Sequence, residues 1–73
     1  MYFLVRLTGG AANDWRTCEL VIFEGTSCDS VYNEAGDYAE SYLGYDFPEI
    51  EILEIFSKNE AEEFSENNGV LIF

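Results

Sequence analysis

The sequence predicts an α+β domain in which a four-stranded, largely antiparallel sheet lies under one amphipathic helix, with a short second helix beside it. Two observations lead to this prediction. Apolar side chains alternate with polar ones in several short segments, which is typical of strands, and recur every three or four residues in a central segment, which is typical of a helix. The predicted order is ββαβαβ. At 73 residues the chain makes one domain, residues 1–73, with one small core.

The first two strands are predicted on either side of a glycine-rich connection. Residues 2–8 alternate, with three apolar side chains on one phase: Phe3, Val5 and Leu7. Residues 9–14, Gly-Gly-Ala-Ala-Asn-Asp, predict a connection of hairpin type. Residues 15–24 predict the second strand, whose middle, residues 20–23, is apolar on both phases. This indicates either a central position in the sheet or cover by a helix on one side and aromatic rings on the other.

A helix is predicted after Gly25 and ends near Gly44. Its start can be capped by Thr26 together with Asp29, or by Ser27 itself. Gly36 weakens the helix by about 1 kcal/mol relative to Ala, unless close packing requires it. Spacings of three and four define one apolar face: Cys28, Val31, Ala35, Tyr38, Ala39 and Tyr42. The opposite face is polar: Asp29, Asn33, Asp37 and Glu40, with Glu34 at its edge.

Residues 48–56 predict the third strand, around which we expect the domain to be organised. Ile50 and Ile52 are predicted to enter the core while the intervening glutamates stay in water. The alternation breaks at Leu53, after which Glu54 would fall on the inner phase. Two explanations are open: a bulge that re-aims the strand, or burial of its far end on both faces.

The last elements are a short helix and a short strand. Asn59 with Glu62 is the capping pair that we expect at the start of this helix, and Gly69 ends it. Two side chains can anchor it to the sheet: Ala61 and Phe64. Residues 70–73, Val-Leu-Ile-Phe, predict an apolar final strand. We expect Phe73 to pair within the sheet or against another subunit.

The charge balance limits the possible partners. Fifteen Asp and Glu oppose three Lys and Arg, with no His, for a formal net charge of −12. Binding to nucleic acids and anionic membranes depends on Lys and Arg, so neither is an expected direct partner. A basic protein is favoured instead, because complementary charge speeds its capture. The alternative explanation is that the acidity only keeps a small domain in solution.

We expect a reducing compartment, because the sequence shows no signal peptide. The apolar run of residues 2–5 is too short for a signal peptide, and no segment is long enough for a transmembrane anchor. We therefore expect a cytoplasmic protein in which Cys18 and Cys28 are small buried thiols, with a disulfide between them as the alternative. Two cysteines without His do not make a tetrahedral zinc site.

No constellation of residues indicates a reaction. The chain has no His base, no Gly-x-Ser-x-Gly motif, no phosphate-binding glycine loop with Lys and no Cys-His pair. Its carboxylates lack the spacing of an EF-hand loop. We therefore expect no enzyme activity, no catalytic residues, no metal and no cofactor.

The distribution of acids is the most informative feature. Eleven acids lie between Glu34 and Glu66, where Lys58 is the only opposing cation. Carboxylates on alternate strand residues or on one helix face are spaced by several Å, which is of the same order as phosphates along a nucleic acid. We expect seven of these acids to bind a partner: Asp37, Glu40, Glu49, Glu51, Glu60, Glu62 and Glu63. Two exposed rings are candidate anchors beside them: Tyr32 and Tyr45.

In size and charge the chain resembles small, acidic, often phage-encoded inhibitors that imitate DNA, such as anti-CRISPR proteins, anti-restriction proteins and inhibitors of uracil-DNA glycosylase. The resemblance implies a non-enzymatic inhibitor in the host cytoplasm that occupies the basic nucleic-acid site of a defence protein, in the first place a CRISPR effector. Two alternatives remain. One is a protein-interaction or self-associating module that forms a homodimer through residues 70–73. The other is an immunity or antitoxin protein that neutralises a basic nuclease.

Overall fold

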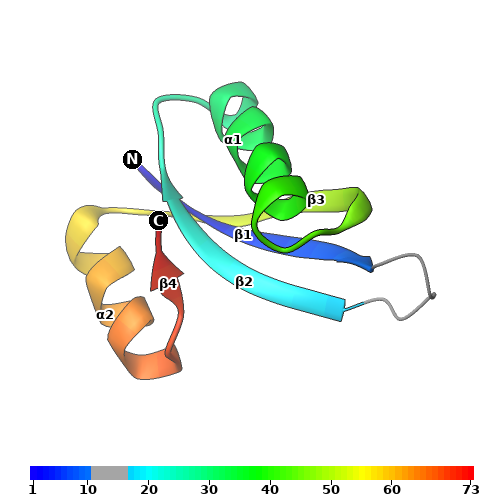
Figure 1. The fold of residues 1–73 in the computed structure, drawn as a ribbon. Helices are drawn as coiled ribbons and strands as arrows, with labels where there is room; N and C mark the ends of the chain where they lie inside the picture. Colours follow the sequence, from blue (N-terminus) through cyan, green and yellow to red (C-terminus); the bar gives the residue numbers. More distant parts are fainter. Residues whose placement is uncertain (11–16) are drawn as a thin grey trace.

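The computed structural model describes residues 1–10 and 17–73 and shows the predicted order ββαβαβ (Figure 1). The elements are β1 (Tyr2–Gly10), β2 (Thr17–Glu24), α1 (Cys28–Ser41), β3 (Asp46–Phe56), α2 (Lys58–Asn68) and β4 (Leu71–Ile72). The strands form one sheet in the order β3-β1-β2-β4. This confirms the α+β class, but the sheet is mixed rather than largely antiparallel, because β4 pairs with β2 in parallel. The first two residues of the predicted connection, Gly9 and Gly10, belong to β1 instead, whereas its residues 11–14 and the predicted first residues of the second strand, 15 and 16, lie outside the described residues.

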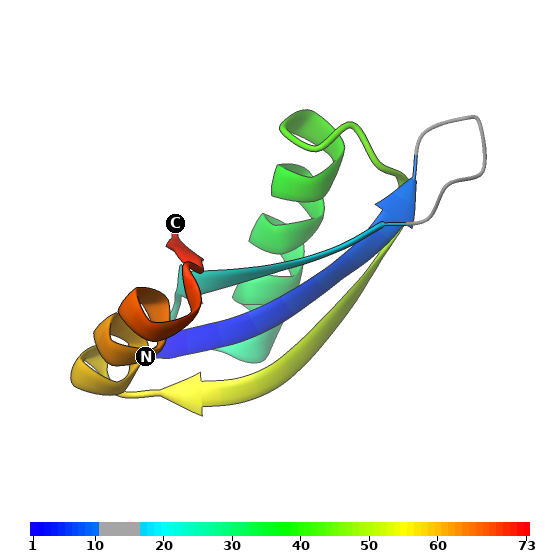
Figure 2. The ribbon, with the colours of Figure 1, turned by 90° about the horizontal axis from the view of Figure 1, so that it is seen from below.

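Strand β1 is the centre of the fold and is apolar on both faces. Phe3, Val5 and Leu7 are fully buried in a cluster with the inward residues of α1. Leu4 points the other way and packs in a second cluster with Ala61 of α2. The two helices therefore lie on opposite faces of the sheet, as Figure 2 also shows, with α2 over only one end of its face.

Strand β2 has the central position that its apolar middle predicts. It pairs with β1 on one side and with β4 on the other. Val21 and Phe23 are buried in the α1 cluster, whereas Ile22 is buried in the α2 cluster. The segment is apolar on both phases because each face of β2 is covered by a different helix.

Helix α1 begins at the second of the two predicted caps. Ser27 has an extended backbone, and its hydroxyl accepts a hydrogen bond from the backbone N–H of Ser30 at 3.2 Å. The Ser30 hydroxyl lies 3.4 Å from the Ser27 backbone N–H, which completes a capping box. The helix ends at Ser41, and Gly44 then takes a left-handed backbone with φ +67°. Gly44 thus turns the chain towards β3 rather than capping the helix itself.

A bulge in β3 resolves the broken alternation of the sequence. Leu4 pairs with Glu54 and the next residue, Val5, pairs with Ile52, so Leu53 is the extra residue. The bulge shifts the phase of the strand, and Glu54 is exposed instead of entering the α1 core. It also places Phe56 on the opposite side, where it packs in the α2 cluster with Phe64 at 5.3 Å between ring centroids.

The N-cap of α2 lies two residues before the predicted one. The prediction of Asn59 with Glu62 is wrong, because Ser57 has the extended backbone of an N-cap and Glu60 stands three residues after it. The Ser57 hydroxyl accepts from the Glu60 backbone N–H at 3.3 Å. Gly69 ends the helix in a left-handed conformation with φ +65°, as predicted. Both predicted anchors face the sheet, Ala61 fully buried and Phe64 partly buried.

The chain end closes the sheet on the β2 side. The Phe73 backbone N–H donates to the Ile22 carbonyl at 2.8 Å, so the first of its two predicted positions, within the sheet, is confirmed. Its ring packs against Phe23 and Tyr38 at centroid distances of 5.5 and 4.9 Å. These ring contacts join β4 to the α1 layer.

The connection from α1 to β3 is fastened to the end of the sheet. The Tyr45 backbone N–H donates to the Ala39 carbonyl at 3.0 Å, and its phenol oxygen accepts from the Thr17 hydroxyl at 2.7 Å. The Tyr45 ring lies directly on Gly9, where an added Cβ would be 2.8 Å from Tyr45 Cδ2. Gly9 is thus required for this close approach, whereas a Cβ on Gly36 would make an ordinary 3.8 Å contact with Ile50.

These two glycines give a matched pair of substitutions. We expect Gly9→Ala to destabilise the fold by about 1 to 3 kcal/mol, because the methyl group displaces the Tyr45 ring. Gly36→Ala should raise the free energy of unfolding by up to about 1 kcal/mol, because alanine favours the helix and the space is open. Urea unfolding of both variants measures the two shifts, and equal shifts of the same sign would contradict the packing at Gly9.

Candidate partner-binding surface

One face of the sheet carries α2 and seven of the fourteen exposed carboxylates in residues 1–10 and 17–73. Three residues of β1 on this face, Leu4, Arg6 and Thr8, each pair with a glutamate of β3. Directly opposed residues of paired strands share a face, so these glutamates point to the side on which α2 packs. With the exposed glutamates of α2 they form what we call the acidic face: Glu49, Glu51, Glu54, Glu60, Glu62, Glu63 and Glu66.

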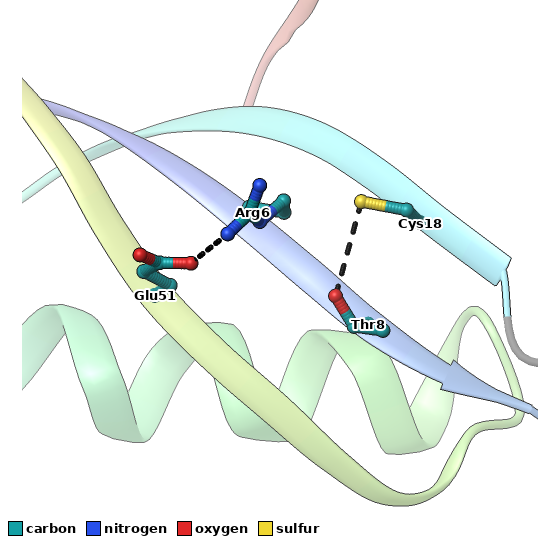
Figure 3. A network of polar contacts seen from close by, with 4 residues as sticks. All are labelled: Arg6, Thr8, Cys18 and Glu51. Atoms are coloured by element: carbon teal, nitrogen blue, oxygen red, sulfur yellow. Dashed lines mark hydrogen bonds and ion pairs between the residues drawn. The ribbon is translucent and has the colours of Figure 1, made fainter.

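Little positive charge opposes the acidic face. Within residues 1–10 and 17–73 the cationic side chains are Arg6 and Lys58. Arg6 forms an ion pair with Glu51 across the β1–β3 pair, as Figure 3 shows, with both side chains about half exposed. An ion pair this open to water contributes at most about 1 kcal/mol, and the seven glutamates of the acidic face outnumber these two cations. The acidic face therefore carries a strong negative field.

The structure brings together five of the seven predicted partner-binding acids. Glu49, Glu51, Glu60, Glu62 and Glu63 all belong to the acidic face. The other two, Asp37 and Glu40, are exposed on α1, which covers the opposite face of the sheet. Glu54 and Glu66 join the five although the prediction left them out. The α1 acids thus form a separate group across the sheet.

Glu60 has a structural role within the acidic face. Its carboxylate accepts a hydrogen bond from the Ser57 backbone N–H at 2.9 Å. This bond, with a second contribution from the Ser57 hydroxyl, lowers the pKa of Glu60. Replacing Glu60 would disturb the start of α2 as well as the surface charge. The remaining α2 glutamates are better probes of binding: Glu62, Glu63 and Glu66.

The exposed rings differ from the predicted anchors. Tyr32 is 43% exposed on α1, but Tyr45 is packed on Gly9 and serves the fold. Two rings that the prediction missed are more exposed, Phe47 at 94% and Tyr42 at 73%. Helical spacing predicts Tyr42 on the apolar face of α1. In the structure its ring stacks on the outside of Tyr38. Phe47 lies in a segment that the sequence presents only as a break before proline.

The prediction of buried thiols is wrong, since both cysteines are free and exposed. Cys18 pairs with Thr8 on the part of the sheet that α2 leaves open, and the Thr8 hydroxyl lies 3.8 Å from its sulfur (Figure 3). Cys28 is the first residue of α1, at the end of the apolar stripe, and it is exposed there. Helical spacing identifies the side of the helix but not how far the sheet reaches beneath it.

The residues that the structure describes form neither a metal-ligand cluster nor a membrane-spanning helix. No three His, Cys, Asp or Glu side chains in this part of the chain converge as metal ligands would. Neither α1 nor α2 has the length and apolar content needed to cross a membrane.

The comparisons with known proteins give no relative: no family model matches the chain, and neither a curated protein nor a solved structure is significantly similar to it.

The Glu60 cap makes a prediction about pH. Because the pKa of Glu60 is lowered from its ordinary value of 4.5, its contribution to stability is complete above that value and is lost as the pH falls through the lower, folded-state pKa. Glu60→Gln removes this titration while keeping an oxygen that can accept from Ser57. We expect the stability advantage of the wild type over Glu60→Gln to shrink between pH 5 and pH 3 in urea unfolding. A constant difference across this interval would contradict the role of the carboxylate.

Proposed function

We propose that the protein is a non-enzymatic inhibitor that binds the basic nucleic-acid site of another protein through the acidic face. The observation that supports this proposal most directly is the concentration of seven exposed glutamates on one side of the sheet, where Arg6 and Lys58 are the described cations. Keeping like charges together destabilises a compact fold, and this small domain has buried apolar clusters on both faces of its sheet to hold them.

The spacing of the carboxylates on the acidic face suits a partner that binds phosphates. Glu49 and Glu51 are alternate residues of β3, roughly 6.6 Å apart along a strand. Glu62 and Glu66 are four residues apart on α2, where side chains are about 5 to 6 Å apart. Such rows offer carboxylates at intervals comparable to those of a nucleic-acid backbone. We propose a DNA-mimic inhibitor of the anti-CRISPR type, with a CRISPR effector complex as the first candidate partner.

A second candidate function is self-association at β4. This strand is at the edge of the sheet, and the side chain of Leu71 is 54% exposed there. An edge of this kind can pair with a second copy. Only two residues form β4, and the Phe73 ring is turned onto α1, so the available edge is short. An immunity-type inhibitor of a basic nuclease would use the acidic face in the same way as the first proposal.

Charge reversal on α2 tests the proposal. The triple variant Glu62→Lys, Glu63→Lys and Glu66→Lys changes the acidic face and spares the Glu60 cap. We expect it to lose at least about tenfold in affinity, because each of the three lost charge contacts weakens binding by roughly half a kcal/mol or more. The measurement is competition between the protein and double-stranded DNA for purified CRISPR effector complexes, restriction enzymes and uracil-DNA glycosylase.

The matched control carries the same charge change on the other side of the sheet. Glu34→Lys, Asp37→Lys and Glu40→Lys alter the exposed acids of α1. This variant should retain most of the affinity if the position of the charge matters and not only its total. Equal losses in the two variants would reduce the effect to net charge, and wild-type protein that competes for no member of the panel would refute the proposal.

A further inference from the structure

Phe47 combines two unfavourable features at one position. Its side chain is 94% exposed, although moving a phenylalanine ring out of water is favourable. Its backbone is left-handed, with φ +49°, and Phe47 is the only non-glycine residue with positive φ in the described part of the chain. A left-handed backbone is strained at such a residue, because its Cβ approaches the following carbonyl oxygen. Residues held in this way are found preferentially at binding sites.

A second bulge in β3 explains the conformation. Thr8 pairs with Glu49, and Gly10, two residues later, pairs with Asp46. Two residues of β3, Phe47 and Pro48, therefore oppose one residue of β1. Proline has no N–H to donate, and a bulge on an edge strand is one of the places where a sheet accepts it. The left-handed residue of a bulge is commonly glycine, yet the sequence has a phenylalanine here.

The ring projects from a segment that is fixed on both sides. Tyr45 precedes it, held on Gly9 and by its hydrogen bond from the Thr17 hydroxyl. Ile50 follows and packs against the α1 core. Phe47 is thus held at a bulge between two packed residues and not on a free loop. A ring presented in this way loses little conformational entropy on binding, which is a property of interface anchors.

Acidic residues are close to Phe47 in the sequence. Asp46 and Glu49 are exposed on either side of it in the sequence, and β3 continues from there along the acidic face to α2. We propose that Phe47 is an anchor residue that enters an apolar pocket bordered by Lys or Arg on the basic partner. The choice of partner rests on the proposed function. The pocket would lie at one end of the basic groove that the acidic face occupies.

Substitutions at Phe47 separate this role from folding. Phe47→Gly removes the ring and relieves the left-handed backbone, so it should be at least as stable as Phe47→Ala in urea unfolding. Both variants should lose about 30-fold in affinity, the usual size of a hot-spot effect. Phe47→Tyr should stay within about threefold of the wild type, and so should Tyr32→Ala, the matched exposed ring on α1. The probes are those members of the CRISPR effector, restriction enzyme and glycosylase panel that the wild type binds.

Salt dependence distinguishes the anchor from the acidic face. Loss of an apolar anchor lowers affinity by the same factor at each ionic strength, whereas charge reversal on α2 flattens the decline of affinity with salt. Wild-type affinity in both Phe47→Ala and Phe47→Gly, together with loss in the α2 triple variant, would overturn the anchor and leave the proposed function standing. The reverse pattern would support the anchor and refute the acidic face. A wild type that binds no panel member would overturn both.

Discussion

The pairing of β1 with both β2 and β3 is the constraint on which the rest of the structure depends. Because β1 buries Phe3, Val5 and Leu7 on one face and Leu4 on the other, each face of the sheet needs a cover. A chain of this length has only two helices to provide it in the described residues, one for each face. The α1 acids are consequently separated from the α2 acids by the sheet itself. The partition of negative charge into two surfaces thus follows from the burial pattern of a single strand.

The sequence predicts the elements well and their long-range relations less well. Alternation and helical spacing find all six elements, and the break at Leu53 gives the first bulge as one of two explanations, because these signals lie within a few neighbouring residues. The parallel pairing of β4 depends on the position in space at which the chain leaves α2, and no local sequence pattern encodes this position. At the start of α2, Ser57 and Asn59 are both suitable caps, and the structure differs from the prediction by only two residues.

The sequence predicts the excess of acids but not which of them share the acidic face. Counting acids between Glu34 and Glu66 identifies an excess of charge. It does not say on which face of the sheet each acid lies. The register of β3 on β1 is what selects Glu49, Glu51 and Glu54 for the side of α2. The exposure of Phe47 is not predicted for a different reason: an aromatic residue beside a proline is ordinarily expected to be in the core. Its exposure arises from a bulge whose register only the paired strands define.

Charge and ring have complementary physical roles in a surface of this kind. Carboxylates act at a distance, raise the rate of encounter with a basic partner and orient it, but their contacts remain hydrated and weaken with salt. A ring acts only on contact, yet burying it removes a large apolar area from water and slows dissociation. The two are joined by one strand, since β3 carries Phe47 near its first residue and leads from its last residue into α2. A surface with acids alone would attract many basic proteins, and one rigid ring at its end adds a requirement of shape that most of them cannot meet.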